Sequence, residues 1–441
     1  MLLLVVLLLG SCSNDLMESV NQSSGTSGAT TRVDMQTALD RAERMLAKIE
    51  GGKTRSRRVA SIRYLNIDGK TRAEGSLDSL YYIINYADNG GFAVAGADTR
   101  LDGIYAISEE GHLEESDVEE NPGLQYFFDM LPDEECLDML GKPGIGTGSG
   151  PGMGMDTTLL VLPPIQFTDI DLSEKIGPYI HPNVSHWHQE DPFNNECPVK
   201  NGIRCHAGCV PVATAIIMSY YEWPNSYGNN VYDWQAMKNA TLANGQIIAT
   251  YIPNLIRHLG AGNNYDTNYN SVNDKGEIIG SSSDTKAHYK RTFRHFGYQE
   301  PKDFKDFDNN ALQAFLKDSH GPVLVRGNRD KDGHAWVIDG YYLDSHVGTA
   351  YVGGRGGDGL MFHVIWGWGG NRNGYFKFGG SIESVYKYND SNDDWRWKHY
   401  YLYDKEAYYN TPRFSDRHNY GGMTRNRYIC KKEENQNGKT I

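Results

Sequence analysis

Two residues of this sequence have side chains that together can break an amide bond. Cys209 follows a glycine turn in the run HAGCVPVATAIIMSYYEWP (206–224), and His334 begins the apolar run HAWVIDGYYL (334–343). A thiolate is a nucleophile, and an imidazole beside it can take up the thiol proton and pass it on to a leaving amine. Taken singly, Cys209 also fits a buried structural cysteine and His334 a structural histidine.

The residues after Cys209 predict an amphipathic helix that starts at the cysteine. Pro211 suits the first helical turn, where a missing N–H costs nothing, and Val210, Ala213 and Ile217 recur at helical spacing. The free N–H groups and the dipole of a helix N-terminus stabilise a thiolate. The sequence therefore predicts a lowered pKa for the Cys209 thiol.

Amide hydrolysis by a thiol also needs donors for the oxyanion and a group that orients the histidine. Gln189, in WHQEDPFN (187–194), lies upstream of the cysteine, where its side-chain amide could join the backbone N–H of Cys209 in binding an oxyanion. His334 lies 125 residues after Cys209, close to the separation expected of papain-like enzymes.

Residues 1–12, MLLLVVLLLGSC, predict that the protein leaves the cytoplasm. An apolar run this short is typical of a signal peptide rather than of a membrane-spanning helix. Its end, LGSC, resembles a bacterial lipobox, in which Cys12 would carry lipid; an ordinary secretory signal is the alternative. Residues 13–33 are small and polar and predict a flexible tether. We expect a cell-envelope lipoprotein (outer membrane or cell surface) or a secreted protein, with lipid on Cys12 as its only membrane contact.

Residues 34–137 predict a small α+β domain. An amphipathic helix over 34–50 has Asp34 as its N-cap, and strands follow between 58 and 108, with the turn DNGG (88–91) as a hairpin signal. A short helix is expected near 124–131. This domain contains no evident catalytic constellation.

Residues 138–160 predict an exposed linker between two domains. Nearly every second residue of GKPGIGTGSGPGMGM (141–155) is glycine, so the segment cannot bury a core. Such a linker is a favoured site of proteolysis, and a passive spacer is the alternative.

Residues 161–441 predict a second α+β domain, with helices first and a sheet afterwards. Beyond the helix at Cys209, helical stretches are expected over 230–260 and 284–318. The strands are expected at 322–327, 334–343, 361–368 and 374–379. A Tyr- and Asn-rich extension, 391–441, follows, with late strands near 399–409.

The net charge of −13 argues against nucleic acid as a partner but says little about the substrate. Residues 109–135 alone carry eleven Asp and Glu and no Lys or Arg, so most of the imbalance belongs to one segment.

Together, the motifs resemble the streptopain family of papain-like cysteine peptidases, which are bacterial enzymes made as zymogens. The resemblance covers nearly the whole chain and rests on the order and spacing of WHQEDPFN, AGCVPVATAIIMSYYEWP, GHAWVIDGY and HVIWGWGGNRNGYF, with GGFAVAGAD in the N-terminal domain. It implies a papain-like cysteine peptidase fold of the α+β class, preceded by a small α+β inhibitory pro-domain.

The resemblance also implies roles for four residues. Cys209 would be the nucleophile, His334 the general acid and base, Gln189 the oxyanion donor, and Trp366 the aromatic residue that packs beside the histidine and shields it from water. It implies no cofactor. The expected partners are protein or peptide substrates and the chain's own pro-domain as inhibitor.

One position departs from the family pattern. Members typically have Asn where this chain has Ile365, so the side chain that would orient His334 is apolar. A backbone carbonyl and Trp366 are then expected to hold His334, as in a dyad. A catalytically silent surface-binding module is a second hypothesis, and a Cys–His amidase or transglutaminase is a third.

Three further patterns suggest other sites. Cys197, Cys205, His206 and Cys209 invite a zinc site, but their spacing is not standard, and a Cys197–Cys205 disulfide is favoured in an exported protein. NRDKDGHAWVID (328–339) imitates a calcium loop without flanking helices. The glycine-rich run 353–359 predicts a flap over the cleft.

Overall fold

The structure is a computed structural model of the 441-residue chain. It describes residues 32–52, 57–65, 71–72, 80–101, 103–129, 131, 170–240, 251–272, 278–298, 305–307, 309–318, 321–328, 333–347, 356–370, 372–378, 385–389, 395–399 and 406–408. The predicted signal (1–12), nearly all of the tether (13–33) and the linker (138–160) lie outside these residues.

Residues 32–131, here called the N-terminal unit, have the predicted α+β content. Its main elements are α1 (Met35–Ile49), β1 (Val59–Leu65), β2 (Thr71–Arg72), β3 (Tyr81–Tyr86), β4 (Phe92–Gly96), β5 (Ile104–Ser108), α2 (Glu115–Glu120) and α3 (Pro122–Asp129). Asp34 caps α1 by accepting a hydrogen bond from the Thr37 N–H, as predicted. Asp88 and Asn89 adopt positive φ in the tight turn between β3 and β4, which confirms the hairpin.

Residues 170–408, here called the C-terminal unit, begin with short strands and helices and end in a sheet. Its elements are β6 (Ile170–Asp171), β7 (Glu174–Ile176), α5 (Pro182–Ser185), β8 (Val199–Lys200), β9 (Ile203–Arg204), α6 (Cys209–Tyr221), β10 (Ser226–Tyr227), β11 (Asn230–Val231), α7 (Trp234–Asn239), α9 (Ile252–Leu259), β12 (Asn268–Val272), β13 (Ile278–Ser282), α10 (Thr285–His295), β14 (Lys305–Asp306), α11 (Asn309–Lys317), β15 (Val323–Asn328), β16 (Gly333–Val347), β17 (Gly356–Ile365), β18 (Gly374–Phe376), β19 (Val385–Asn389), β20 (Trp395–His399) and β21 (Glu406–Tyr408).

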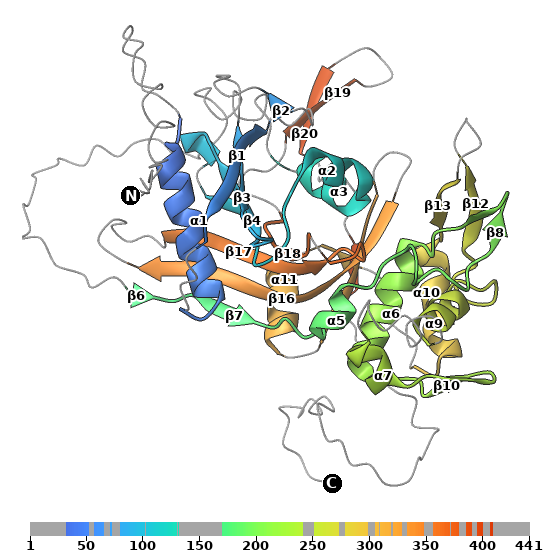
Figure 1. Ribbon diagram of the computed structural model, residues 1–441. Helices are drawn as coiled ribbons and strands as arrows, with labels where there is room; N and C mark the ends of the chain where they lie inside the picture. Colours follow the sequence, from blue (N-terminus) through green and yellow to red (C-terminus); the bar gives the residue numbers. More distant parts are fainter. Residues whose placement is uncertain are drawn as a thin grey trace, which may run out of the picture.

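One sheet runs through both units. In the described residues it has thirteen strands, in the order β14-β21-β15-β16-β17-β18-β5-β4-β3-β1-β2, with β6 and β7 also paired to β16. The two units meet at β18 and β5, where Tyr375 pairs with Ile107 and Phe376 with Ala106. In Figure 1 the blue N-terminal strands and the orange C-terminal strands form this sheet, and the green and yellow helices gather to one side of it.

The helix that starts at Cys209 is buried on all sides rather than amphipathic. Every residue from Val210 to Ser219 is buried. The helix α6 packs against β15 and β16 and is also in contact with α5, α9 and β13, so no face is left for water. The apolar residues that recur at helical spacing, Val210, Ala213 and Ile217, form only one side of this buried helix.

Three other sequence predictions are corrected. The stretch 230–260 is not one helix, because strand β11 and the short helices α7 and α9 divide it. The stretch 284–318 is not one helix either, because strand β14 lies between α10 and α11. Gly356 to Gly359, predicted as part of a flap, are strand residues of β17 that pair with β16. None of the helices in the described part of the chain is both long and apolar enough to span a bilayer.

Candidate active site

Cys209 is the first residue of α6, as the sequence predicts. Gly208 precedes it with φ of +90°, a conformation that a residue with a β-carbon rarely adopts, and this lets the chain turn sharply into the helix. Backbone hydrogen-bonding groups of Cys209, Val210 and Ala335 lie around the thiol. Ala335 follows His334 in β16, so the packing of α6 on β16 brings the thiol next to the segment that carries the histidine.

The predicted low pKa of the Cys209 thiol is wrong for this form of the chain. Burial raises the pKa of Cys209, and the backbone hydrogen bonds from Ala335 and Val210 only partly oppose that effect. Removal of water disfavours the charged form of any group, and here this outweighs the helix N-terminus. The thiol is therefore held as the neutral S–H.

His334 lies at the start of β16, opposite Gly327 of β15. Its ring is buried, and its Nε2 lies 3.0 Å from the backbone oxygen of Trp366. A carbonyl oxygen can only accept a hydrogen bond, so Nε2 carries the proton and Nδ1 is left as the basic nitrogen. A backbone carbonyl was expected to hold the histidine, and the structure shows that Trp366 supplies it.

Aromatic rings enclose the imidazole. Trp336 stacks on it with ring centroids 6.1 Å apart, and Trp368 meets it edge-on at 6.2 Å. The resemblance implies this role for Trp366 alone. In the structure Trp366 contributes its carbonyl, and its own ring packs on Trp336 and Phe376. Burial lowers the pKa of His334 to about 4, against a smaller opposite effect of the Trp366 carbonyl.

Gln189 is a buried donor without a partner among the described residues. The residue is 4% exposed, and its Nε2 makes no hydrogen bond. Its backbone oxygen accepts from the N–H of Ala207, two residues before Cys209. A buried donor left unpaired costs free energy, so its retention points to a ligand atom that completes it. The backbone contact places Gln189 at the loop that precedes the nucleophile candidate, and its role as oxyanion donor stays a prediction.

Ile365 does not reach toward His334 as an orienting group. It pairs with Val337 across β16 and β17, is fully buried, and belongs to the apolar cluster around α6. Asn373, near the end of the motif HVIWGWGGNRNGYF, is instead next to the histidine's partner. Its Oδ1 accepts the N–H of Trp366 at 3.1 Å, and its Nδ2 donates to the oxygen of Ser185 at 2.9 Å.

The N-terminal unit covers this site. A β-carbon built on Gly123 of α3 would lie 2.3 Å from Cε3 of Trp366 and 2.9 Å from Cδ2 of His334. Asn121 caps α3 through its Oδ1, which accepts from the N–H of Gly123. On the same face, Tyr126 packs on Trp336 with ring centroids 5.2 Å apart. These contacts leave no room for a peptide beside His334.

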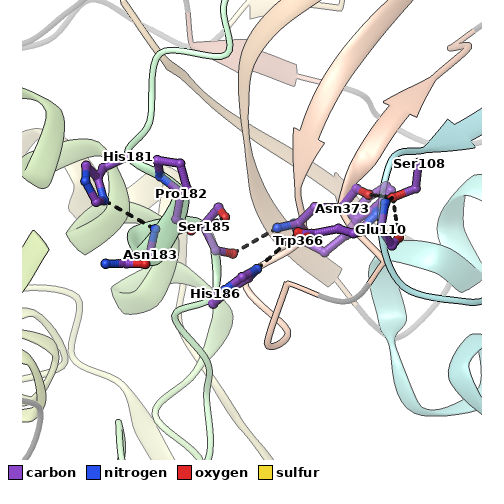
Figure 2. A network of polar contacts seen from close by, with 9 residues as sticks. All are labelled: Ser108, Glu110, His181, Pro182, Asn183, Ser185, His186, Trp366 and Asn373. Atoms are coloured by element: carbon purple, nitrogen blue, oxygen red, sulfur yellow. Dashed lines mark hydrogen bonds and ion pairs between the residues drawn. The ribbon is translucent and has the colours of Figure 1, made fainter. Parts of the chain in front are cut away.

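Polar contacts between the two units lie at Asn373 and at His186 (Figure 2). The Ser108 hydroxyl donates to the backbone oxygen of Asn373 at 2.7 Å, and Nε2 of His186 lies 3.2 Å from Oε1 of Glu110. The hydrogen bond to His186 lowers the pKa of Glu110. Arg372 also forms an ion pair across the interface with Asp117, whose side chain is 5% exposed.

The other candidate sites are not assembled. Cys197 and Cys205 are free thiols, so the expected disulfide is not formed; the Cys205 thiol instead donates to the backbone oxygen of Tyr269 at 3.1 Å. Among the described residues, no group of three or more His, Cys, Asp and Glu side chains is arranged to hold a metal ion. Asp339, the last residue of the calcium-like pattern, is buried in β16, where its side chain bonds His363 and the N–H of Ile180.

Several residues of the candidate active site cannot be recognised from the sequence, because their role depends on long-range contacts. Trp336 and Trp368 lie within predicted strands, and Asn373 lies within the quoted motif HVIWGWGGNRNGYF. Nothing local distinguishes these three from core residues. Gly123 carries no signal in the sequence. Glycine is needed there only because a β-carbon would clash with Trp366 and His334, which are distant in the chain.

Comparisons with known proteins match both units. Residues 187–376 match the family model described as Peptidase C10 family, and residues 30–134 match the one described as Spi protease inhibitor. The chain is 25% identical over 349 residues to the thiol protease/hemagglutinin PrtT of Porphyromonas gingivalis, covering 71% of this chain and 35% of that protein. It is 28% identical over 227 residues to streptopain of Streptococcus pyogenes, covering 44% and 53%.

The chain thus spans about a third of the length of PrtT and about half that of streptopain. Among solved structures, a fragment of prointerpain A from Prevotella intermedia, a mutant with one cysteine replaced by alanine, aligns with a TM-score of 0.47 and 20% identity, covering 75% of this chain and 94% of that one. The family matches cover the segments that carry Cys209, His334 and Gly123, and residues 187–376 of this chain belong to the peptidase C10, or streptopain, family.

Proposed function

We propose that this chain is a cysteine endopeptidase made as an inactive precursor. The observation that carries the proposal is the packing of α6 on β16, which sets the Cys209 thiol beside the backbone of Ala335, next to His334. Family membership supports the same activity. Cys209 is the nucleophile, His334 the general acid and base, and Gln189 the oxyanion donor.

In the proposed reaction, Nδ1 of His334 takes the proton of the Cys209 thiol, and Sγ attacks the scissile carbonyl carbon. The developing oxyanion receives hydrogen bonds from the Cys209 N–H and from Nε2 of Gln189. The C–N bond then breaks, the amine leaves with the proton from His334, and a thioester remains on Cys209. Water, deprotonated by His334, hydrolyses the thioester and restores the thiol.

The N-terminal unit acts in this proposal as an inhibitory pro-domain. Gly123 occupies the space beside His334, and the surrounding burial keeps both reacting groups neutral, because it raises the pKa of Cys209 and lowers the pKa of His334. Removing the pro-domain lets water reach both groups, and the thiolate–imidazolium pair then becomes favourable at the helix N-terminus. Cleavage in the 138–160 linker would release it.

Labelling and hydrolysis together test the activity. The full-length chain, before and after limited proteolysis of the linker, is treated with a thiol-directed epoxide and assayed on casein. We expect labelling and hydrolysis to rise after cleavage and to disappear in Cys209→Ala. Cys197→Ala, which removes a buried free thiol elsewhere in the C-terminal unit, is the matched control and should keep both.

Each other outcome contradicts a defined part of the proposal. Equal activity of the uncut and cut chains contradicts the zymogen. Absence of Cys209-dependent labelling favours a surface-binding module, and labelling without proteolysis favours an amidase or transglutaminase. Casein hydrolysis that survives in Cys209→Ala assigns the chemistry to another residue.

We also propose that the protein is exported and carries lipid on Cys12. The proposal is supported by the apolar run and the LGSC sequence of residues 1–12. Metabolic labelling with an alkyne fatty acid should mark the wild-type protein and not Cys12→Ser. Equal labelling of both would contradict lipidation at Cys12, and release of the unlabelled protein into the medium would favour an ordinary secretory signal.

A further inference from the structure

We propose that Asn373 is a positioning residue that orients His334 through the backbone of Trp366. The inference rests on the proposed peptidase function. Family members typically have an Asn that orients the histidine where this chain has Ile365, and Asn373 takes over that role for His334. Asn373 does not touch His334. It holds the residue whose carbonyl does.

The side chain of Asn373 bridges two segments of the C-terminal unit. It is 6% exposed, and both ends of its amide are used: Oδ1 accepts from the N–H of Trp366, and Nδ2 donates to the oxygen of Ser185 in α5. Figure 2 shows this bridge, with Asn373 between the Trp366 backbone and Ser185. The amide therefore fixes Trp366 relative to a helix that lies 181 residues earlier in the chain.

The loop from Trp366 to Asn373 needs such a clamp. Gly367, Gly369 and Gly370 all have positive φ, between +69° and +89°. Glycine has access to much more backbone conformational space than other residues, so this loop has little stiffness of its own. The peptide that carries the Trp366 oxygen is followed directly by Gly367. With the N–H of Trp366 bound by Asn373, and the N–H of Asn373 bound to the Gly370 oxygen at 2.9 Å, the loop is closed on itself.

The position of the Trp366 oxygen decides which nitrogen of His334 carries the proton. Because that oxygen accepts from Nε2–H at 3.0 Å, Nδ1 is left unprotonated and able to take the thiol proton. If the oxygen moves away, the tautomer with the proton on Nδ1 becomes populated, and that tautomer cannot act as the base. A wrong histidine tautomer is a known route to large losses of kcat in hydrolases of this type.

The bridge belongs to the C-terminal unit alone. Trp366, Ser185 and Asn373 all follow the predicted linker in the sequence, so the bridge does not depend on the N-terminal unit. Ser108 of the N-terminal unit adds one hydrogen bond, to the backbone oxygen of Asn373. Asn373 thus positions Trp366 in the precursor and in the activated enzyme.

The test compares Asn373→Ala and Asn373→Asp with Asn264→Ala. Asn264 is also a buried amide that bridges two segments, bonding the His258 oxygen and His295, but it has no contact with Trp366 or His334. It therefore controls for loss of stability alone. The full-length chains are activated identically and assayed on casein across pH.

We expect Asn373→Ala to lower kcat by a factor on the order of 10², the cost of misplacing a catalytic group by about 1 Å. Asn373→Asp keeps the acceptor for the Trp366 N–H and regains the donor to Ser185 only when its carboxyl is protonated. Its activity profile should therefore be displaced toward acid relative to wild type. Asn264→Ala should keep the wild-type profile.

A second measurement does not depend on activity. The measurement is an NMR spectrum of full-length protein with ¹⁵N-labelled histidine, in which the His334 ring signals are those that disappear in His334→Gln. These signals should show the Nε2–H tautomer in wild type and a mixture of tautomers in Asn373→Ala. A pure Nε2–H tautomer and unchanged kcat in Asn373→Ala would overturn the inference. Absence of Cys209-dependent hydrolysis in wild type would overturn the proposed function instead, while the spectra would still decide the role of Asn373. If Asn373→Ala does not fold, Asn373→Asp carries both measurements.

Discussion

The backbone of Gly123 packs against the imidazole of His334, although the two residues belong to units joined by a glycine-rich linker. A β-carbon at Gly123 would lie 2.9 Å from the His334 ring and closer still to the indole of Trp366. The backbone on the two sides of this contact is fixed, on one side by the Asn121 cap of α3 and on the other by the Trp366 carbonyl. The contact is therefore tight enough for one methyl group to change it.

Gly123→Ala should weaken the docking of the N-terminal unit. Overpacking a close contact costs about 1–3 kcal/mol, so the uncleaved chain should hydrolyse casein roughly ten times faster than wild type or more. Gly280→Ala is the control, because a β-carbon there meets nothing within 4 Å. If the uncleaved Gly123→Ala chain is as latent as wild type, Gly123 is not where inhibition occurs.

The elements were largely predictable because local patterns determine them. Asp34 at the N-cap of α1 and the DNGG turn between β3 and β4 act within a few residues, and both are found as predicted. The helix at Cys209 was predicted in position but not in its surroundings. Burial on all sides depends on β15, β16 and α9, which come from distant parts of the sequence.

The site was predictable as a set of residue types but not as an environment. Cys209 and His334 could be chosen from spacing and resemblance, whereas the pKa of each depends on what excludes water from it. The N-terminal unit contributes to that exclusion at His334. At Cys209, burial raises the pKa, so the predicted low value was wrong for this form of the chain. The link from Asn373 to His334 passes through backbone atoms of Trp366, which residue types do not reveal.

Breaking the buried ion pair between Arg372 and Asp117 should destabilise the docked form. Both side chains are largely buried, at 18% and 5% exposure. Arg372→Met leaves the Asp117 carboxylate without its cation, and removing one partner of a buried pair costs about 3 kcal/mol or more. The free energy of unfolding of the uncleaved chain, measured in the Cys209→Ala background to prevent self-cleavage, should fall by that amount.

Arg58→Ala is the control for this pair, because Arg58 and Asp88 are highly exposed and 3.9 Å apart. Surface pairs of this kind contribute about 0–1 kcal/mol. A double variant, Arg372→Met with Asp117→Asn, should recover part of the loss, because no buried charge is then left alone. Equal effects of Arg372→Met and Arg58→Ala would show that the buried pair does not hold the units together.

Replacing Gln189 should separate activity from stability. Gln189→Met removes the unpartnered Nε2 and keeps a side chain of similar length, so the midpoint of thermal unfolding should stay the same or rise. Loss of one oxyanion donor should lower kcat of the activated enzyme by about 10²–10³. Unchanged kcat would remove Gln189 from the oxyanion site, and a large fall in thermal stability would show that its amide is structural.

Acid should destabilise the uncleaved chain through His334. Burial lowers the pKa of His334 from 6.5 to about 4, so the unfolded chain binds a proton at a higher pH than the folded one does. The stability that the neutral ring contributes is complete above pH 6.5 and is lost as pH falls toward 4, by up to about 3 kcal/mol. Unfolding by urea in the Cys209→Ala background, at pH 7, 5.5 and 4, measures this loss.

His334→Gln should remove most of this loss of stability. Glu110→Gln removes a carboxyl whose pKa is also lowered, so it should change only the loss that occurs below about pH 4.5. A stability that declines equally with and without His334 would place the acid-sensitive group elsewhere.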